Sequence, residues 1–210
     1  DRWIFDTVNS TPDSHTFWDA ADGSATWYGY LPTVPTSGDA AAQLEAFNAQ
    51  YFDGTFQNIQ QVALEPNSPT IAWALTTAEF NGNPAAVLTY VDTSVSGQQR
   101  VQMLMGKPDT LQASLADIQQ SIQIDGVGAF NGVDSTRIGT LLGGGAPVGQ
   151  TPAVVATTPA ALPATVPAPT ATTVVAGTTP TTAAQPGGAL TQTVPVGQDT
   201  VAYGGDWQHS

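Results

Sequence analysis

The residues of this chain that could perform chemistry are few, and their spacing matches no catalytic motif. His15 and His209 are the only histidines. A Ser-His-Asp triad would have to use His15 as its base, and no Gly-x-Ser-x-Gly sequence presents a serine to it. Carboxylates are plentiful, but no spacing selects the pair that a glycosidase needs. Most acids fall where turns and helix caps favour them: Asp22, Asp39, Asp53, Asp109 and Asp125. The sequence therefore predicts a non-enzymatic protein with no catalytic residue.

Metal and cofactor motifs are equally scarce. The chain has no cysteine, so thiolate metal sites and disulfides are excluded. The segment Asp19 to Gly23 is acidic but lacks the alternating ligands and the distal Glu of a calcium loop. Gly143 to Gly145 lacks the Lys-Ser/Thr pair of a phosphate-binding loop. We expect no metal and no cofactor.

Four aromatic side chains are the candidate ligand-binding residues. Trp18, Trp27, Tyr28 and Tyr30 lie on two neighbouring predicted strands. They could form a platform on which a sugar stacks if one face of the hairpin is open. Alternatively they fill two core layers, and we favour this interpretation because large aromatic side chains contribute most through burial.

Charge limits the choice of partners. The formal net charge is −13, and Arg2, Arg100, Lys107 and Arg137 are the only lysines and arginines. So weak a positive field disfavours nucleic acid and anionic membrane surfaces as partners. No apolar run approaches the ~20 residues of a membrane span. We expect a protein or glycan partner, which the sequence does not identify, and no direct membrane insertion.

A long uncharged segment sets the predicted domain organisation. Residues 139–198 carry no charged side chain and are mostly Thr, Ala, Pro, Gly and Val. Such a composition offers too little apolar surface to offset ordering, so we expect a disordered linker. Its Thr-Pro clusters are typical of O-glycosylated stalks and equally of unmodified spacers. The folded domain is then residues 1–138, and residues 199–210 are a candidate start of a second domain. Asp206-Trp207 resembles the opening of the chain around Trp3, which raises the hypothesis of tandem copies.

Turn signals and periodicity define the elements of residues 1–138. Asp22-Gly23 predicts a two-residue hairpin turn between strands 15–21 and 24–31, with Trp18 opposite Trp27. Asp39 caps a predicted helix at 40–51, whose apolar stripe includes Leu44, Phe47 and Tyr51. Further strands are expected at 56–64, 71–80, 85–95 and 100–105.

A second helix is predicted near the end of the folded domain. Asp109 is its expected N-cap, and Leu111, Leu115, Ile118 and Ile122 form its apolar stripe. Asp125-Gly126 is expected to end it, and residues 127–142 have no clear period and are expected to be coil. Strand runs that carry two helices predict an α+β domain with an antiparallel sheet and helices packed on its faces.

This element order resembles the PsbP-like α/β/α sandwich. The resemblance rests on the opening Trp3-Ile4-Phe5-Asp6 strand and on the closing helix from Pro108 to 124, and it covers residues 1–126. PsbP is an extrinsic protein of photosystem II, and similar domains occur in secreted bacterial lipoproteins. The resemblance implies a protein that binds or stabilises a partner, and it transfers no functional residue to a position here.

Together these patterns predict an extracellular or cell-surface binding or adhesion module on a flexible stalk. Two alternatives stay open. The chain could be an accessory domain of a secreted or surface enzyme, such as a hydrolase, whose catalytic part lies elsewhere. It could also be a structural spacer in a tandem surface array.

Overall fold

The computed structural model describes residues 3–19, 21–33, 38–143, 190–196, 199–204 and 208–209. Most of the predicted linker, 144–189, lies outside the described residues, as does Trp207. Residues 1–146 and 188–210 belong to one compact unit.

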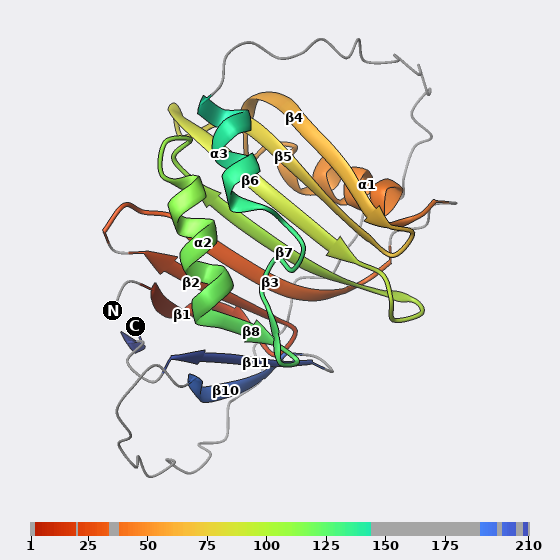
Figure 1. Cartoon of the computed structure of the whole chain (residues 1–210), viewed down its shortest axis with the longest axis vertical. Coiled ribbons are helices and arrows are strands. Elements are labelled where there is room, and N and C mark those ends of the chain that lie inside the picture. Colours follow the sequence, from red (N-terminus) through yellow and green to blue (C-terminus); the bar gives the residue numbers. More distant parts are fainter. Residues whose placement is uncertain are drawn as a thin grey trace. The chain divides into compact units, whose positions relative to one another are not determined.

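A large antiparallel sheet forms the centre of the described chain (Figure 1). Its strand order is β12-β1-β2-β3-β7-β6-β5-β4, and only the pairing of β12 with β1 is parallel. The strands are β1 (Trp3–Thr11), β2 (Ser14–Asp19), β3 (Ala25–Pro32), β4 (Gln57–Ser68), β5 (Ile71–Phe80), β6 (Asn83–Asp92), β7 (Gln98–Gly106) and β12 (Gln208–His209). The predicted β5 has the observed bounds, and β4, β6 and β7 differ from their predictions by a few residues at their ends.

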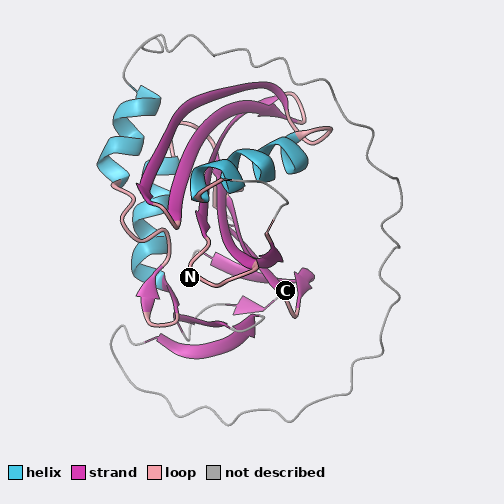
Figure 2. Ribbon diagram, turned by 90° about the vertical axis from the view of Figure 1, so that its right-hand side faces the viewer, coloured by secondary structure: helices cyan, strands magenta, loops and turns pink. Residues whose placement is uncertain are grey.

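Alternation along the central strands gives the sheet two apolar faces. On β5, Trp73 and Leu75 point to one face, whereas Ala72 and Ala74 point to the other. Different elements cover the two faces, and Figure 2 shows helices on both sides of the strands. The predicted α+β fold, an antiparallel sheet with helices packed on its faces, is therefore confirmed.

Helix α1 (Ala40–Phe52) covers the face that carries Ala72 and Ala74. The Asp39 carboxylate caps its first turn by accepting hydrogen bonds from the Ala41 and Ala42 amides. Leu44 and Phe47 are buried against the sheet, as predicted. Tyr51, which the sequence placed on the same stripe, is 42% exposed because it lies at the edge of the buried face.

The opposite face is covered by α2 (Leu111–Ser121), α3 (Ser135–Gly143) and a small second sheet. The order of this sheet is β10-β11-β8-β9, from β8 (Ile122–Ile124), β9 (Val127–Gly128), β10 (Leu190–Val196) and β11 (Asp199–Gly204). The coil predicted at 127–142 is therefore wrong for α3, whose Ile138 is fully buried.

The second predicted helix differs at both ends. Its N-cap is Thr110, not Asp109, and no side chain caps its first turn. It ends at Ser121, after which Ile122 and Ile124 pair with β11 as a strand. Helical periodicity was correct up to Ile118, but a distant pairing partner decides the state of the next two isoleucines.

The β2–β3 hairpin has a longer turn than predicted. The Asp19 amide donates to the Ser24 carbonyl, so four residues separate the paired ends. Trp18 consequently lies opposite Ala25, and Thr16 lies opposite Trp27. The predicted register is wrong by two residues, but a two-residue shift preserves the alternation of faces. Trp18 and Trp27 therefore still share one face.

The C-terminal strands pack on the same unit as the N-terminal ones. Val201 pairs with Ile124 across β11 and β8, and Val196 and Val201 are buried in the same core cluster as Trp73. Residues 199–210, considered above as a candidate start of a second domain, thus include a strand that completes this one.

We expect the unit to reassemble from two chains. Residues 1–146 without 188–210 should lose at least about 3 kcal/mol of stability, because Val196 and Val201 are both buried and burying each valine contributes about 1.5–3 kcal/mol. A synthetic 188–210 peptide should restore the melting temperature in a saturable titration followed by circular dichroism. A Val201→Asp peptide is the control, and equal rescue by both peptides would contradict the role of β11.

Candidate functional site

The four candidate aromatic residues do not form one surface. Tyr28 and Tyr30 are buried, with 5% and 6% of their surfaces exposed. Trp27 is partly buried and stacks on Phe47 of α1, with ring centroids 6.3 Å apart. Trp18 is 37% exposed on the same face as Trp27. The two tyrosines point to the opposite face, so this arrangement favours the core interpretation for three of the four.

Trp27 is held in place by a glycine two positions along its strand. A Cβ on Gly29 would lie 2.1 Å from the Trp27 indole, so the ring occupies the space over the bare backbone. The indole is thereby directed onto Phe47, which continues the stack to Tyr51 with centroids 4.3 Å apart. Trp27 therefore connects the sheet to α1.

Replacing Gly29 with Ala should displace this indole. We expect the free energy of unfolding to fall by about 1–3 kcal/mol, because a methyl group forced into a packed site displaces its neighbours. Urea unfolding followed by tryptophan fluorescence measures it. Gly143→Ala is the matched control, because nothing lies within 4 Å of its added Cβ. Equal stability of the two variants would contradict the packing role of Trp27.

A charged cluster lies where β7, β8 and β11 meet. The Arg100 guanidinium lies 2.7 Å from the Asp199 carboxylate and 3.3 Å from Asp125. Asp92 lies 3.6 Å away at the end of β6. The Asp199 side chain is only 1% exposed, and it also accepts a hydrogen bond from the Tyr28 hydroxyl. These contacts attach the C-terminal strand to the large sheet.

Burial controls the protonation of this cluster. Desolvation raises the pKa of Asp199 above its ordinary 3.8, while the Tyr28 hydroxyl and Arg100 offset part of the rise. Burial and the Asp199 carboxylate raise the pKa of Tyr28 as well, so its hydroxyl remains a donor. Desolvation lowers the pKa of Arg100, but Asp199 and its other acidic neighbours raise it overall. The charged groups of the cluster are paired with one another, which favours a structural role.

Acidification should therefore raise the stability of the wild-type protein relative to that of the Asp199→Asn variant. A carboxyl whose pKa is raised in the folded state stabilises that state as it takes up a proton. The difference in unfolding free energy, wild type minus variant, should rise as pH falls from neutral to 3.8, the ordinary value. Urea titrations at several pH values measure it. A difference that falls with acid would mean that ion pairing outweighs desolvation at Asp199.

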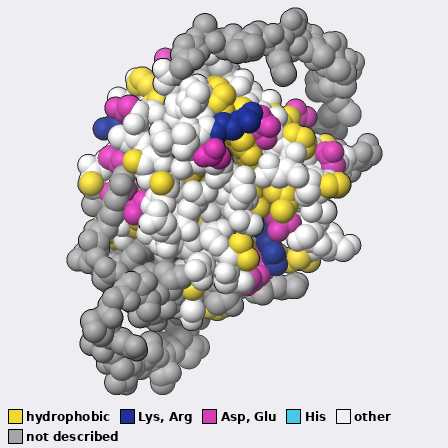
Figure 3. Space-filling view, in the orientation of Figure 1, with side chains coloured by type: hydrophobic (Ala, Val, Ile, Leu, Met, Phe, Trp, Pro, Cys, Tyr) yellow, Lys and Arg dark blue, Asp and Glu magenta, His cyan; other side chains and the backbone are white. Residues whose placement is uncertain are grey.

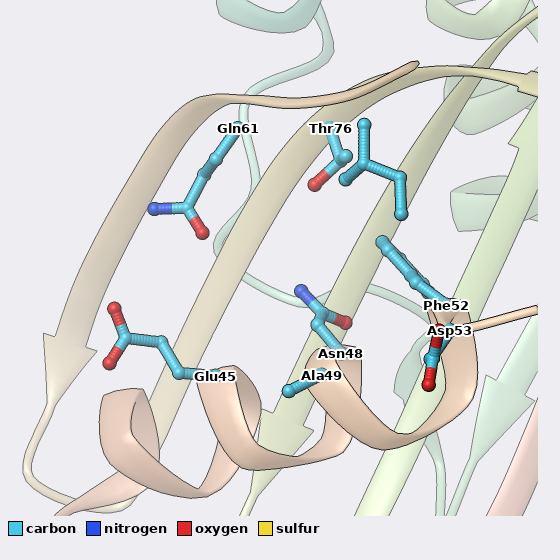
Figure 4. A pocket seen from close by; sticks show the side chains of 8 residues that line it. Glu45, Asn48, Ala49, Phe52, Asp53, Gln61 and Thr76 are labelled. Carbon is cyan, nitrogen blue, oxygen red and sulfur yellow. The ribbon is translucent and has the colours of Figure 1, made fainter. Parts of the chain in front are cut away.

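A cleft on the other face, between α1 and β4, is the candidate binding site (Figure 4). Its volume is about 410 Å³. Helix α1 and the residue after it supply one wall, the edge strand β4 supplies the other, and β5 contributes Thr76. The lining residues are Glu45, Asn48, Ala49, Phe52, Asp53, Ile59, Gln61 and Thr76.

The cleft exists because β4 is irregular where it faces the second half of α1. Its pairing with β5 shifts register between Gln57 and Gln60 and again between Gln61 and Ala63. Asn58 has a positive φ of 51°, which a non-glycine residue seldom adopts outside turns. Bulges of this kind bend an edge strand, and here residues 57–61 are exposed and leave Ile59 and Gln61 along an open wall.

Asn48 gives this cleft a specific polar feature. It follows Phe47 on α1 and is only 9% exposed, yet its Oδ1 has no hydrogen-bond partner. A buried acceptor without a partner costs roughly 1–3 kcal/mol. Figure 4 shows the amide between the helix and the strands, inside the cleft. The sequence did carry a signal, because an Asn four residues after Leu44 is a polar residue on a stripe that must be buried.

The cleft is rich in acceptors. Glu45 and Asp53 supply carboxylates, and Asn48 and Gln61 supply amide oxygens. No Lys or Arg lines it. On the face drawn in Figure 3, the few basic side chains lie against acidic ones. Arg100 and Arg137, for example, pair with Asp199 and Glu65. The lining thus suits a ligand that donates hydrogen bonds.

Two negative findings apply to the described residues. Within them, no three His, Asp or Glu side chains lie close enough to share a metal ion. No helix in this part of the chain is long and apolar enough to cross a membrane.

Comparison with solved structures finds two chains of a related arrangement. The α+β sheet-and-helix arrangement is similar to that of the Ran-binding protein Mog1p from Saccharomyces cerevisiae, with a TM-score of 0.40 and 11% sequence identity. The similarity covers 53% of this chain and 70% of that chain. A mutant of protein Mog1 gives a TM-score of 0.39 at the same identity and coverage.

No protein-family model and no curated protein matches this chain.

Proposed function

We propose that this chain is an extracellular, non-enzymatic binding module that takes its ligand in the α1–β4 cleft. The observation that supports it is the Asn48 side chain, which lines the cleft and whose buried Oδ1 has no hydrogen-bond partner. Buried polar groups in proteins are nearly always satisfied, and a ligand N–H group that donated to this oxygen would satisfy it. The extracellular placement rests on the acidic, cysteine-free composition and the Thr/Pro-rich segment 139–198.

The Asn48→Leu variant tests the proposal by separating stability from binding. Leu has nearly the same shape and removes the unsatisfied acceptor, so we expect unchanged or higher stability in urea. Ligands found on glycan and peptide arrays should bind the variant at least tenfold more weakly than wild type. Chemical shift changes in wild type should concentrate at residues 45–53 and 57–61.

Two outcomes would contradict the proposal. Asn48→Leu could destabilise the fold by more than 1 kcal/mol, which would make the amide structural. Alternatively the ligands could shift resonances around Trp18 and leave the cleft unaffected. Trp18→Ala is the control variant for that second surface.

A further inference from the structure

Helix α1 ends in an uncompensated negative region beside the cleft. A helix C-terminus carries a partial negative charge, which basic residues usually offset. The last turn of α1 has no basic residue, and its C-cap is Asp53, itself an acid. The chain therefore places a carboxylate where the helix dipole disfavours one. A bound cation would relieve that repulsion.

A second carboxylate lies at the other end of the cleft. Glu45 precedes Asp53 by eight residues, which corresponds to about 12 Å along a helix. Figure 4 shows Glu45 and Asp53 at opposite ends, with Asn48 and Ala49 between them. No ion pair with a described residue involves Glu45 or Asp53. The cleft thus has two negative ends that nothing in the described chain neutralises.

The middle of the cleft is suited to an aliphatic chain. Ala49, Phe52 and Ile59 line it with apolar surface, and Ile59 is 45% exposed. Asn48 lines the same cleft, and its buried Oδ1 is an acceptor without a donor. An aliphatic chain interrupted or flanked by N–H groups would satisfy all of these features together.

From this geometry we infer that the cleft binds alkylammonium groups, two cationic nitrogens separated by an aliphatic chain of about 12 Å. The inference rests on the proposed function and adds the ligand class. Glu45 and Asp53 each accept from one ammonium group, and Asn48 accepts from an N–H between them. The source of such a ligand is either a free linear polyamine or paired lysine side chains of a protein partner.

Isothermal titration calorimetry on the full chain tests the inference. The probes are spermidine, 1,8-diaminooctane and its neutral counterpart octane-1,8-diol. We expect saturable binding of the amines and none of the diol. Glu45→Gln and Asp53→Asn should each weaken binding of the amines at least tenfold, because hydrogen bonds to charged groups contribute about 1.5–3 kcal/mol.

The control variant is Asp13→Asn, which removes the same charge at a distance. Asp13 is exposed in the turn between β1 and β2, and these strands lie near the opposite end of the sheet order from β4. It should change binding less than twofold. An equal loss in all three variants would mean that the amines only screen the net charge of −13, and the inference would be overturned.

A final comparison distinguishes a polyamine ligand from a protein ligand. It also shows whether a negative result contradicts the ligand class alone or the proposed function as well. A peptide with two lysines that binds tenfold better than spermidine, and loses binding on lysine acetylation, identifies a protein partner; the reverse order identifies a polyamine. A neutral ligand that binds the cleft and depends on Asn48 but not on Glu45 or Asp53 would overturn the inference and keep the proposed function. Binding that depends on none of the three residues would overturn both.

Discussion

The burial of Asp199 is the constraint on which the arrangement of this chain depends. A carboxylate removed from water needs a cation and hydrogen-bond donors around it, and here Arg100 and Tyr28 supply them. Those partners lie on β7 and β3, in the middle of the large sheet, whereas Asp199 begins β11. Satisfying one acid therefore fixes the C-terminal strands against the sheet, and these strands in turn give Ile122 and Ile124 their pairing partner.

The sequence predicted those elements whose causes are local. Helix α1 has its N-cap Asp39 and its apolar stripe within one short segment, so both could be read from neighbouring residues. The errors have distant causes. Ile122 is a strand residue because Tyr203 lies opposite it, and no local pattern contains that information. The end of α2 and the strand state of β8 were unpredictable for the same reason.

The candidate site was less predictable than the fold. Four aromatic residues were the candidate ligand-binding residues because exposed aromatic side chains can bind ligands. Their exposure depends on how the sheet assembles, and in the structure Tyr28 and Tyr30 are buried. The cleft depends on an irregular edge strand, and sequence patterns do not reveal where a register shifts. Only Asn48 carried a readable signal, as a polar residue on a buried stripe. Polar exceptions to periodicity are therefore as informative as the periodicity itself.

The parallel pairing of β12 with β1 has a geometric consequence for any longer polypeptide. Ile4 lies beside Gln208 and Phe5 beside His209, so the first and last strands leave the sheet at one edge, where Figure 1 draws both ends of the chain. A polypeptide that continued in both directions would enter and leave at neighbouring points. Both attachment points would lie at the β12–β1 edge of the sheet, at the opposite end of the strand order from β4, which lines the α1–β4 cleft.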